Sequence, residues 1–508
     1  MLFFPEKRVI MTSKKRPYPR RRNYESMKHS KKIWWVLSLL VCAVVSNPVL
    51  AMAAQESDTG DQLGAGMSLA YCIPFAGMLL CIAICPLVIG DLWDKYKWVA
   101  VIFWSLAFLI PFAVNFGVGQ TWKELLEVVF GDYITFIVLL FGLFCVAGNI
   151  CLKGDMAGSP RLNALLILIG GLLASWIGTT GASMLMIRPL LRANAWRKRK
   201  AQIVIFFIFI VSNIGGCLTP VGDPPLLMGF TRGVDFFWSL ELLPIMLLNF
   251  ILLLTIFLFV DIRSYKKDLY DGLKPALGDE KKPLRLEGAH NIIFLVMIVG
   301  AVILSGVLGD IGAIPLYDGV EFPFTSLIEV AIILLAAFLS YKTTKKEVRE
   351  ANNFSWDAIS EVAVLFIGIF ITMVPALMIL KAKGADLGLT HPWQFFWITG
   401  ALSSFLDNTP TYLVFFTTAG ASHLVAKGSI IQILGGSGTI PQVILMAISA
   451  GAVFMGAITY IGNAPNFMVR SIAEENGIKM PSFFGYMVWS LSCLIPVFLI
   501  DTLIFFLG

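Results

Sequence analysis

Apolar runs of about 18 residues or more recur along the whole chain, and they limit what it can fold into. A helix needs about 20 apolar residues to cross the roughly 30 Å hydrocarbon core of a bilayer. Of the 508 residues, 57% are hydrophobic and 14% are charged. Soluble domains carry about 25% charged residues. The sequence therefore predicts an all-α polytopic membrane protein.

The first 53 residues carry most of the basic excess. Eleven Lys and Arg and two Glu give residues 1–53 a net charge of +9, so the rest of the chain has a net charge of −3. A basic start at Met27, an apolar stretch and the Ala51-x-Ala53 pair are typical of a secretory signal peptide that is cut after Ala53. The alternative is an uncleaved first helix. Nucleic-acid binding is not expected of this leader.

The remaining apolar segments form two halves, 68–262 and 291–507, separated by a polar linker at 263–290. Two interrupted segments, 162–193 and 392–425, are predicted to be re-entrant hairpins. Ten further segments are predicted to cross the membrane, and these are 68–90, 98–115, 133–152, 201–230, 236–262, 291–309, 325–341, 356–380, 440–467 and 482–507.

Clusters of Lys and Arg orient the chain. They lie at 192–200, in the linker and at 341–350, and basic residues are enriched in cytoplasmic loops. All three clusters are cytoplasmic if the mature chain starts outside and hairpin 162–193 returns to the face that it entered. Hairpin 392–425 then enters from the opposite face. We therefore expect a multi-pass inner-membrane protein with both mature termini in the periplasm.

The two halves share a motif at a constant offset of 240 residues. The matched positions are Thr219, Gly222, Asp223, Pro225 and Met228 in the first half and Thr459, Gly462, Asn463, Pro465 and Met468 in the second. The hairpin tips match more loosely, "TTGAS" at 179–183 with "DNTPT" at 407–411, at an offset of 228. Inverted repeats with interrupted helices are typical of secondary transporters, whose site lies between the repeats near the membrane midplane.

The stretch "NIGGCLTPVGDPPLLMGF" at 213–230 places prolines, glycines and Asp223 inside an apolar run. A helix broken within the membrane leaves N–H and C=O groups unpaired, each costing several kcal/mol. A carboxylate there adds about 2.5–3.5 kcal/mol on insertion scales. So costly an arrangement favours an ion-binding role. The alternative is that Asp223 caps the half-helix that follows the break.

Candidate ion ligands are the oxygen-bearing residues of the interrupted segments. Asp223 and Asp407 supply carboxylates, which are the proposed ligands of a metal ion such as Na⁺. The neutral candidates are Asn213, Thr219, Asn408, Thr409, Thr411, Thr459, Asn463, Asn466, Thr179, Thr180 and Ser183. A carboxylate that holds a proton or a cation in turn is the minimal chemistry of a cation/proton antiporter. Each hydroxyl can instead pack or bond to its own backbone.

Two further charged residues have open roles. Glu329 is either interfacial or part of a proton relay, and Arg188 either neutralises Asp223 or extends toward the cytoplasm. The eight cysteines and four histidines form no CxxC motif or His cluster, so no zinc site, haem site or disulfide framework is predicted. No HExxH, Ser–His or Walker-type motif indicates an enzyme or an ATP-driven pump.

The motifs "TPVGDPPLLM", "SFLDNTPTYLVFF" and "YIGNAPNFMV" resemble those of NhaD-type sodium/proton antiporters. These belong to the ion transporter superfamily, which also includes arsenite pumps and citrate and dicarboxylate carriers. The likeness covers roughly residues 68–507. It implies a transport domain with elevator-like motion and a scaffold that forms a homodimer. The functional positions it implies are Asp223, Asp407, Ser183, Thr219, Asn408, Thr409 and Asn463.

The function expected from this resemblance is export of Na⁺ or Li⁺ in exchange for protons. No cofactor is expected, and the partners are the lipid bilayer and small ions. The open alternative is a sodium- or proton-coupled carrier of an anion such as citrate, a dicarboxylate or arsenite.

Overall fold

The computed structural model describes residues 60–154, 156–275, 283–309, 311–352, 354–422, 424, 430–432 and 439–507. The predicted leader and signal peptide, residues 1–53, lie outside the described residues. Within these ranges the chain is mainly helical, and strands are confined to three short antiparallel pairs. The predicted all-α polytopic class is confirmed.

Eight helices of the described chain are long and apolar enough to cross a membrane. Seven of them overlap predicted crossings, and the eighth is α6 (Pro160–Ile177), the first arm of a predicted hairpin. Three shorter apolar helices fill the remaining predicted crossings, at Ala201–Gly216, Asn291–Val307 and Gln442–Ile458. Length and composition therefore support seven of the ten predicted crossings, and the other three coincide with apolar helices that are shorter than a full span.

The first half begins with longer helices than predicted. After α2 (Gly60–Gly66), the crossings at 68–90 and 98–115 both lie in α3 (Ile73–Phe116), which consists of two helical stretches that meet at Ile89, where the backbone is not helical. The stretches fold back on each other, since Asn115 Nδ2 donates to Tyr71 Oη at 2.6 Å. The residues between them, "DLWDKYK", contain no glycine or proline and stay helical. A helix also starts before the predicted 133, as α4 (Val118–Leu126) continues through a π-helical turn into α5 (Ile134–Gly148). The charged residues between the apolar runs therefore lie on helices that extend past these runs, and not in loops.

The rest of the first half contains a helix pair and an interrupted helix. α6 and α7 (Thr179–Ala193) pack together and meet at Gly178, whose φ of 78° lies in the region that favours glycine. The interrupted helix consists of α8 (Ala201–Ile210) and α9 (Pro224–Thr231). The long helix α10 (Leu243–Tyr270) follows it and extends eight residues into the predicted linker.

The second half has the same order of elements. It starts with α11 (Asn291–Val307), α12 (Phe324–Thr343), the short α13 (Lys346–Ala351) and α14 (Asp357–Lys383). A second helix pair, an interrupted helix and a final helix follow, and these are α15 (Pro392–Ser403), α16 (Asn408–Ala421), α17 (Gln442–Met455), α18 (Ala464–Glu475) and α19 (Phe483–Asp501).

Short strand pairs connect some of these helices. The pairs are β1 (Cys151–Lys153) with β2 (Arg285–Glu287), β3 (Ala313–Tyr317) with β4 (Val320–Pro323), and β5 (Ile430–Gln432) with β6 (Thr439–Pro441). The pairing of β1 with β2 ties the end of the linker to the segment that follows α5. These pairs were not predicted, because three to five residues give too short a pattern.

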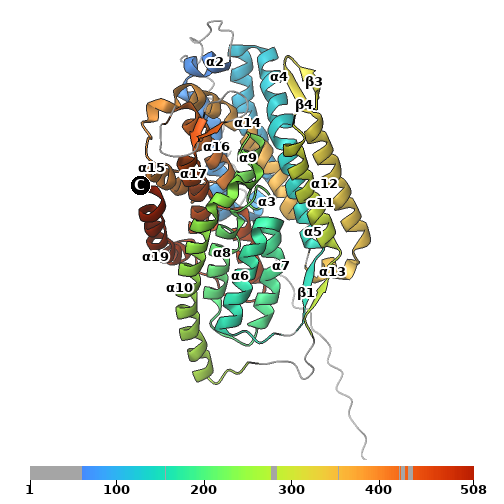
Figure 1. Ribbon diagram of the computed structural model, residues 1–508, viewed down its shortest axis with the longest axis vertical. Helices are drawn as coiled ribbons and strands as arrows, with labels where there is room; N and C mark the ends of the chain where they lie inside the picture. The colour runs from blue at the N-terminus through green and yellow to red at the C-terminus, as the bar shows by residue number, and fades with distance from the viewer. Residues whose placement is uncertain are drawn as a thin grey trace, which may run out of the picture. The chain divides into compact units, whose positions relative to one another are not determined.

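The helices pack in two groups (Figure 1). The scaffold group comprises α2 to α5 and α11 to α14, and the hairpin group comprises both helix pairs, both interrupted helices, α10 and α19. In the view of Figure 1, α5, α11 and α12 lie on one side and α10, α15 and α19 on the other. The groups meet where α5 packs on α7 and where α14 packs on α16. The same kind of contact thus occurs once in each half.

Candidate functional site

The Asp223 carboxylate lies where four helices of the hairpin group begin. Asp223 is the N-cap residue of α9 and is 1% exposed. Its Oδ1 accepts hydrogen bonds from Thr179 Oγ1 at 3.0 Å and from Asn463 Nδ2 at 3.3 Å, and its Oδ2 accepts one from Asn408 Nδ2 at 3.1 Å. Thr179 is the first residue of α7, Asn408 the first of α16, and Asn463 the N-cap of α18. One carboxylate therefore joins both tips and both interrupted helices.

Local sequence explains why α9 and α18 begin at this point. Each has a proline in its first turn, Pro224 and Pro225 in α9 and Pro465 in α18. Proline fits there because the first-turn N–H groups have no partner within the helix. The preceding Asp223 and Asn463 are both extended, and neither side chain makes a capping bond to its own helix. Asp223 therefore does not serve as a simple helix cap.

The shared Thr and Gly of the motif build each break in the same way. Thr219 Oγ1 donates to Ser175 O in the first half, and Thr459 Oγ1 donates to Ser404 O in the second. A Cβ at Gly222 would overlap a backbone carbonyl oxygen of the loop before it, and Gly462 is equally confined. The two threonine hydroxyls are thus used to hold each interrupted helix against its hairpin.

Equivalent hydrogen bonds from a serine in each helix pair show which residues of the two halves correspond, and they change the predicted offset of the hairpins. Ser175 Oγ donates to Gly215 O at 2.5 Å, and Ser404 Oγ donates to Met455 O at 3.0 Å. The interrupted helices keep the offset of 240, since 455 − 215 = 240. The hairpins have an offset of 404 − 175 = 229, not the predicted 228. The N-caps of α7 and α16, residues 178 and 407, also differ by 229. Thr179 therefore corresponds to Asn408, and both bond to Asp223.

A second layer of amides and hydroxyls surrounds Asp223. Asn213 Nδ2 donates to Asn466 Oδ1 at 2.7 Å, and Asn463 Nδ2 also donates to Ser212 O at 3.1 Å. The hydroxyls of Ser183 and Ser212 lie 2.9 Å apart. All five side chains are buried. They join α7 and the break after α8 to α18, so the candidates Asn213, Ser183 and Asn466 support the centre without bonding to Asp223.

Asp407 has a different role from Asp223. It is the partly buried N-cap of α16, and its Oδ1 accepts a hydrogen bond from its own helix, from the backbone N–H of Thr409 at 3.1 Å. Thr411 Oγ1 donates to Asp407 O at 3.0 Å, which also lies within this turn. Thr180 is partly buried and does not bond to Asp223. The structure thus brings Asp223, Thr179, Asn408 and Asn463 together, with Asp407 beside them as a cap.

The two charged residues with open roles lie apart from this centre. Glu329 is buried on α12 in the scaffold group. Arg188 is partly buried on α7, two turns and more beyond Thr179, and makes no ion pair with Asp223. Its Nη1 is buried without a hydrogen-bond partner among the described residues.

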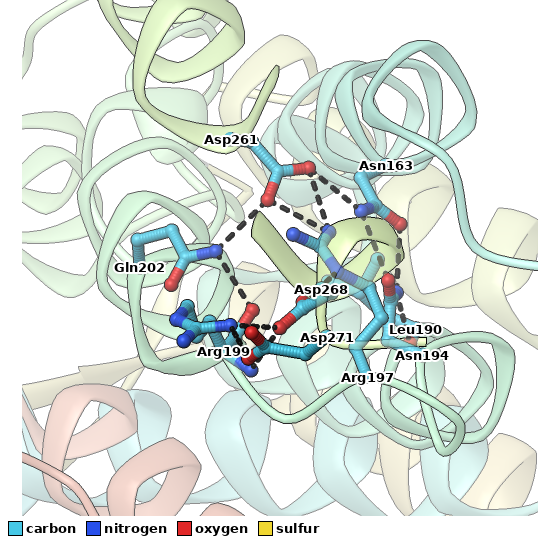
Figure 2. Close-up of polar contacts among 9 residues, drawn as sticks. All are labelled: Asn163, Leu190, Asn194, Arg197, Arg199, Gln202, Asp261, Asp268 and Asp271. Carbon is cyan, nitrogen blue, oxygen red and sulfur yellow. Dashed lines mark hydrogen bonds and ion pairs between the residues drawn. The ribbon is translucent and has the colours of Figure 1, made fainter. Parts of the chain in front are cut away.

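A buried charge network that the sequence reading missed fixes the base of the first helix pair to α10 (Figure 2). Arg197 Nη1 lies 2.7 Å from Asp261 Oδ1, and its Nε lies 3.2 Å from Asp268 Oδ2, with all three side chains fully buried. Arg199 links Asp268 to Asp271 at 2.9 and 2.8 Å. The sequence indicates 192–200 only as a basic cytoplasmic cluster. The sequence does contain one indication of this network. Asp261 and Asp268 lie two turns apart on α10, so both carboxylates are on one face of the helix.

Amide side chains complete the network. Asn163 Nδ2 on α6 donates to Asp261 Oδ2 at 3.0 Å, and Gln202 Nε2 on α8 donates to Asp261 Oδ1 at 2.9 Å. Asn194 Nδ2 donates to Asn163 Oδ1 at 2.7 Å. The network therefore ties α6, the segment after α7, α8 and α10 into one unit, as Figure 2 shows.

A comparison with protein families places this architecture. The family model described as "Putative citrate transport" matches residues 64–506, which include both halves and every residue of the centre. A comparison with curated proteins found no match. The match supports a membrane transporter rather than an enzyme, but it does not confirm the sodium/proton antiporter subtype that the motifs suggested. The chain belongs to this citrate transport family.

Proposed function

We propose that the protein is a secondary transporter of a citrate-like anion, and that Asp223 holds the cation, H⁺ or Na⁺, that moves with it. The observation that carries this proposal is the meeting of four helix N-termini at one buried carboxylate. Interrupted helices in transporters direct their N-termini at anionic substrate groups in this way. The family match supports the same substrate class.

The charges at the centre support coupling between anion and cation. Each helix N-terminus acts as roughly half a positive charge, so four of them supply about two. Asp223 supplies one negative charge and has no ion-pair partner among the described residues. While Asp223 is ionised, it competes with a substrate carboxylate for this positive potential. A bound proton or Na⁺ neutralises Asp223, and the site then favours an anion.

The hydrogen-bonding groups favour an anion over exchange of Na⁺ for protons. The three side chains that reach Asp223 present one hydroxyl and two amide N–H groups, which are donors. Exchange of Na⁺ for protons at a pair of carboxylates would need a second free carboxylate, and Asp407 is bonded to its own helix. Sodium/proton antiport therefore becomes the competing function that an assay has to exclude.

Packing between the helix groups supports an elevator-like movement. Gly181 on α7 lies against Ala147 on α5, where a Cβ on the glycine would be 2.9 Å from the alanine Cβ. Small residues let the two helices approach closely here, and Phe144 on α5 packs with Met184 on α7, so the contact between the groups is apolar. The hairpin group, which contains the whole centre, would move against the scaffold group as one body.

Transport by the purified protein in liposomes tests this function. We expect uptake of labelled citrate when an inward proton or Na⁺ gradient is imposed, and the gradient that drives uptake identifies the coupling ion. Arsenite and a dicarboxylate, tested in the same liposomes, define the substrate class. Proton movement evoked by Na⁺ alone, with no uptake of any anion, would instead establish antiport.

A further inference from the structure

A pocket lies at the junction of α12, α13 and α14, outside the transport centre. It has a volume of about 490 Å³ and is lined by Tyr341, Lys346, Arg349, Glu350, Phe354 and Trp356. The membrane-spanning part of α12 ends at Thr343, and the next spanning helix, α14, begins at Asp357. The pocket therefore lies at the depth where the lipid headgroups of a bilayer are expected.

Positive charge predominates around this pocket. Residues 341–350 contain four Lys and Arg and two Glu. The lysines are exposed, and the ion pair that Lys346 makes within the described part of the chain is with Glu350, at 3.1 Å and with both side chains largely in solvent. Such a pair contributes a few tenths of a kcal/mol and yields readily to a stronger partner. Lys346 is therefore available to a bound anion.

Arg349 is held in a fixed position beside Lys346. Its Nη1 donates to Tyr341 O and to Thr344 O, both at 2.9 Å. Its guanidinium also stacks on the Tyr341 ring, with the central carbon 4.3 Å from the ring centre. The hydrogen bonds described for the guanidinium involve Nη1, so the N–H groups of Nε and Nη2 can serve a ligand. A planar, pre-positioned guanidinium suits phosphate oxygens.

The membrane side of the pocket is aromatic and apolar. Trp356 is 39% exposed and packs between Phe141, Phe354 and Tyr341. Trp and Tyr are enriched at this depth because their rings are both apolar and polar. On α12, Phe338 and Leu335 continue the surface toward the membrane centre and are 57% and 50% exposed. An apolar track thus leads directly from the basic pocket.

We propose that this pocket binds the headgroup of an anionic phospholipid, with the phosphate between Lys346 and Arg349 and an acyl chain along the exposed side chains of α12. A soluble phosphate would use the basic residues but not the apolar track. Basic pockets between membrane helices are suited to anionic headgroups, and each Lys or Arg near such a surface contributes about 1 kcal/mol.

Native mass spectrometry of the full-length protein, released from nanodiscs, tests this site. Phosphatidylglycerol should remain bound in preference to phosphatidylcholine. Lys346→Gln should weaken phosphatidylglycerol binding about fivefold, the factor that corresponds to about 1 kcal/mol. Lys266→Gln is the matched control, since Lys266 is exposed on α10 away from the pocket and its loss should change nothing. Glu350→Gln frees Lys346 and should strengthen binding about twofold.

The increase in Glu350→Gln is informative because a misfolded variant would not bind more tightly. Equal retention of both lipids, an equal loss in the Lys266 control, or no change in either pocket variant would overturn the proposal. Displacement of the lipid by an excess of inorganic phosphate would also overturn it, because the ligand would then be a soluble anion.

Discussion

Replacing Arg197 by methionine should destabilise the protein strongly, because it leaves buried carboxylates without their cation. Arg197 contacts Asp261 at 2.7 Å and Asp268 at 3.2 Å, and none of the three side chains is exposed. Removing one partner of a buried ion pair costs about 3–5 kcal/mol. We expect the lower end, about 3 kcal/mol, since Asp268 keeps its bond to Arg199 and Asp261 keeps its bonds to two amides.

Thermal unfolding of the detergent-solubilised protein, followed by size-exclusion chromatography, measures this loss. About 3 kcal/mol corresponds to a fall in melting temperature of roughly 3 °C or more for a chain of this length. Lys198→Met is the matched control, because Lys198 is the exposed neighbour of Arg197. It should leave the melting temperature unchanged.

A second substitution separates charge from packing at this network. In the double variant Arg197→Met with Asp261→Asn, one stranded charge is removed, so part of the lost stability should return. If Arg197→Met is as stable as the wild type, or if the double variant is no better than the single one, the buried network does not hold the hairpin base to α10.

Three further predictions concern the breaks, the contact between the helix groups and the topology. Gly222→Ala should abolish transport and lower the yield of folded protein, since the alanine Cβ would overlap a backbone carbonyl oxygen. Normal uptake by this variant would contradict the packing described for the break. Arg232→Gln removes the ion pair with Asp132, 3.1 Å long, that joins α9 to the scaffold group. The transport rate should change by up to about fivefold while the substrate affinity stays normal. An unchanged rate would mean that this ion pair does not restrain the movement. A reporter after Gly508 should be active in the periplasm and one at Lys200 in the cytoplasm, and the reverse result at either site would exclude opposed hairpins.

The breaks and the helix pairs could be predicted from sequence because their signals are local. Proline, glycine and polar residues inside long apolar runs mark where a helix stops, and the structure interrupts the chain at 178, 211–223 and 456–463 accordingly. Helix lengths were less predictable. Charged residues such as Glu124 and Lys97 suggest loops, yet they lie on helices that extend beyond the apolar runs.

The roles of the two acids could not be predicted, because both precede a helix by one residue. Tertiary packing distinguishes them. Asp223 turns away from α9 toward three other helices, whereas Asp407 bonds to the first turn of α16. The partners Thr179 and Asn408 correspond to each other only at the offset of 229, which a match of short polar motifs did not resolve.

The proposed transport function depends most on Asp223, which we propose couples a cation to the movement of an anion. Asp223→Asn and Asp407→Asn, each reconstituted in liposomes, test this claim in two citrate assays, accumulation driven by an ion gradient and exchange without a gradient. Asn at position 407 can still cap α16, so this variant should keep both activities. Asn at position 223 keeps the hydrogen-bonding shape but cannot take up a proton or neutralise a cation, so exchange should persist while gradient-driven accumulation is lost. Gradient-driven accumulation by the Asp223→Asn variant at the wild-type level would show that Asp223 does not couple the cation to the anion.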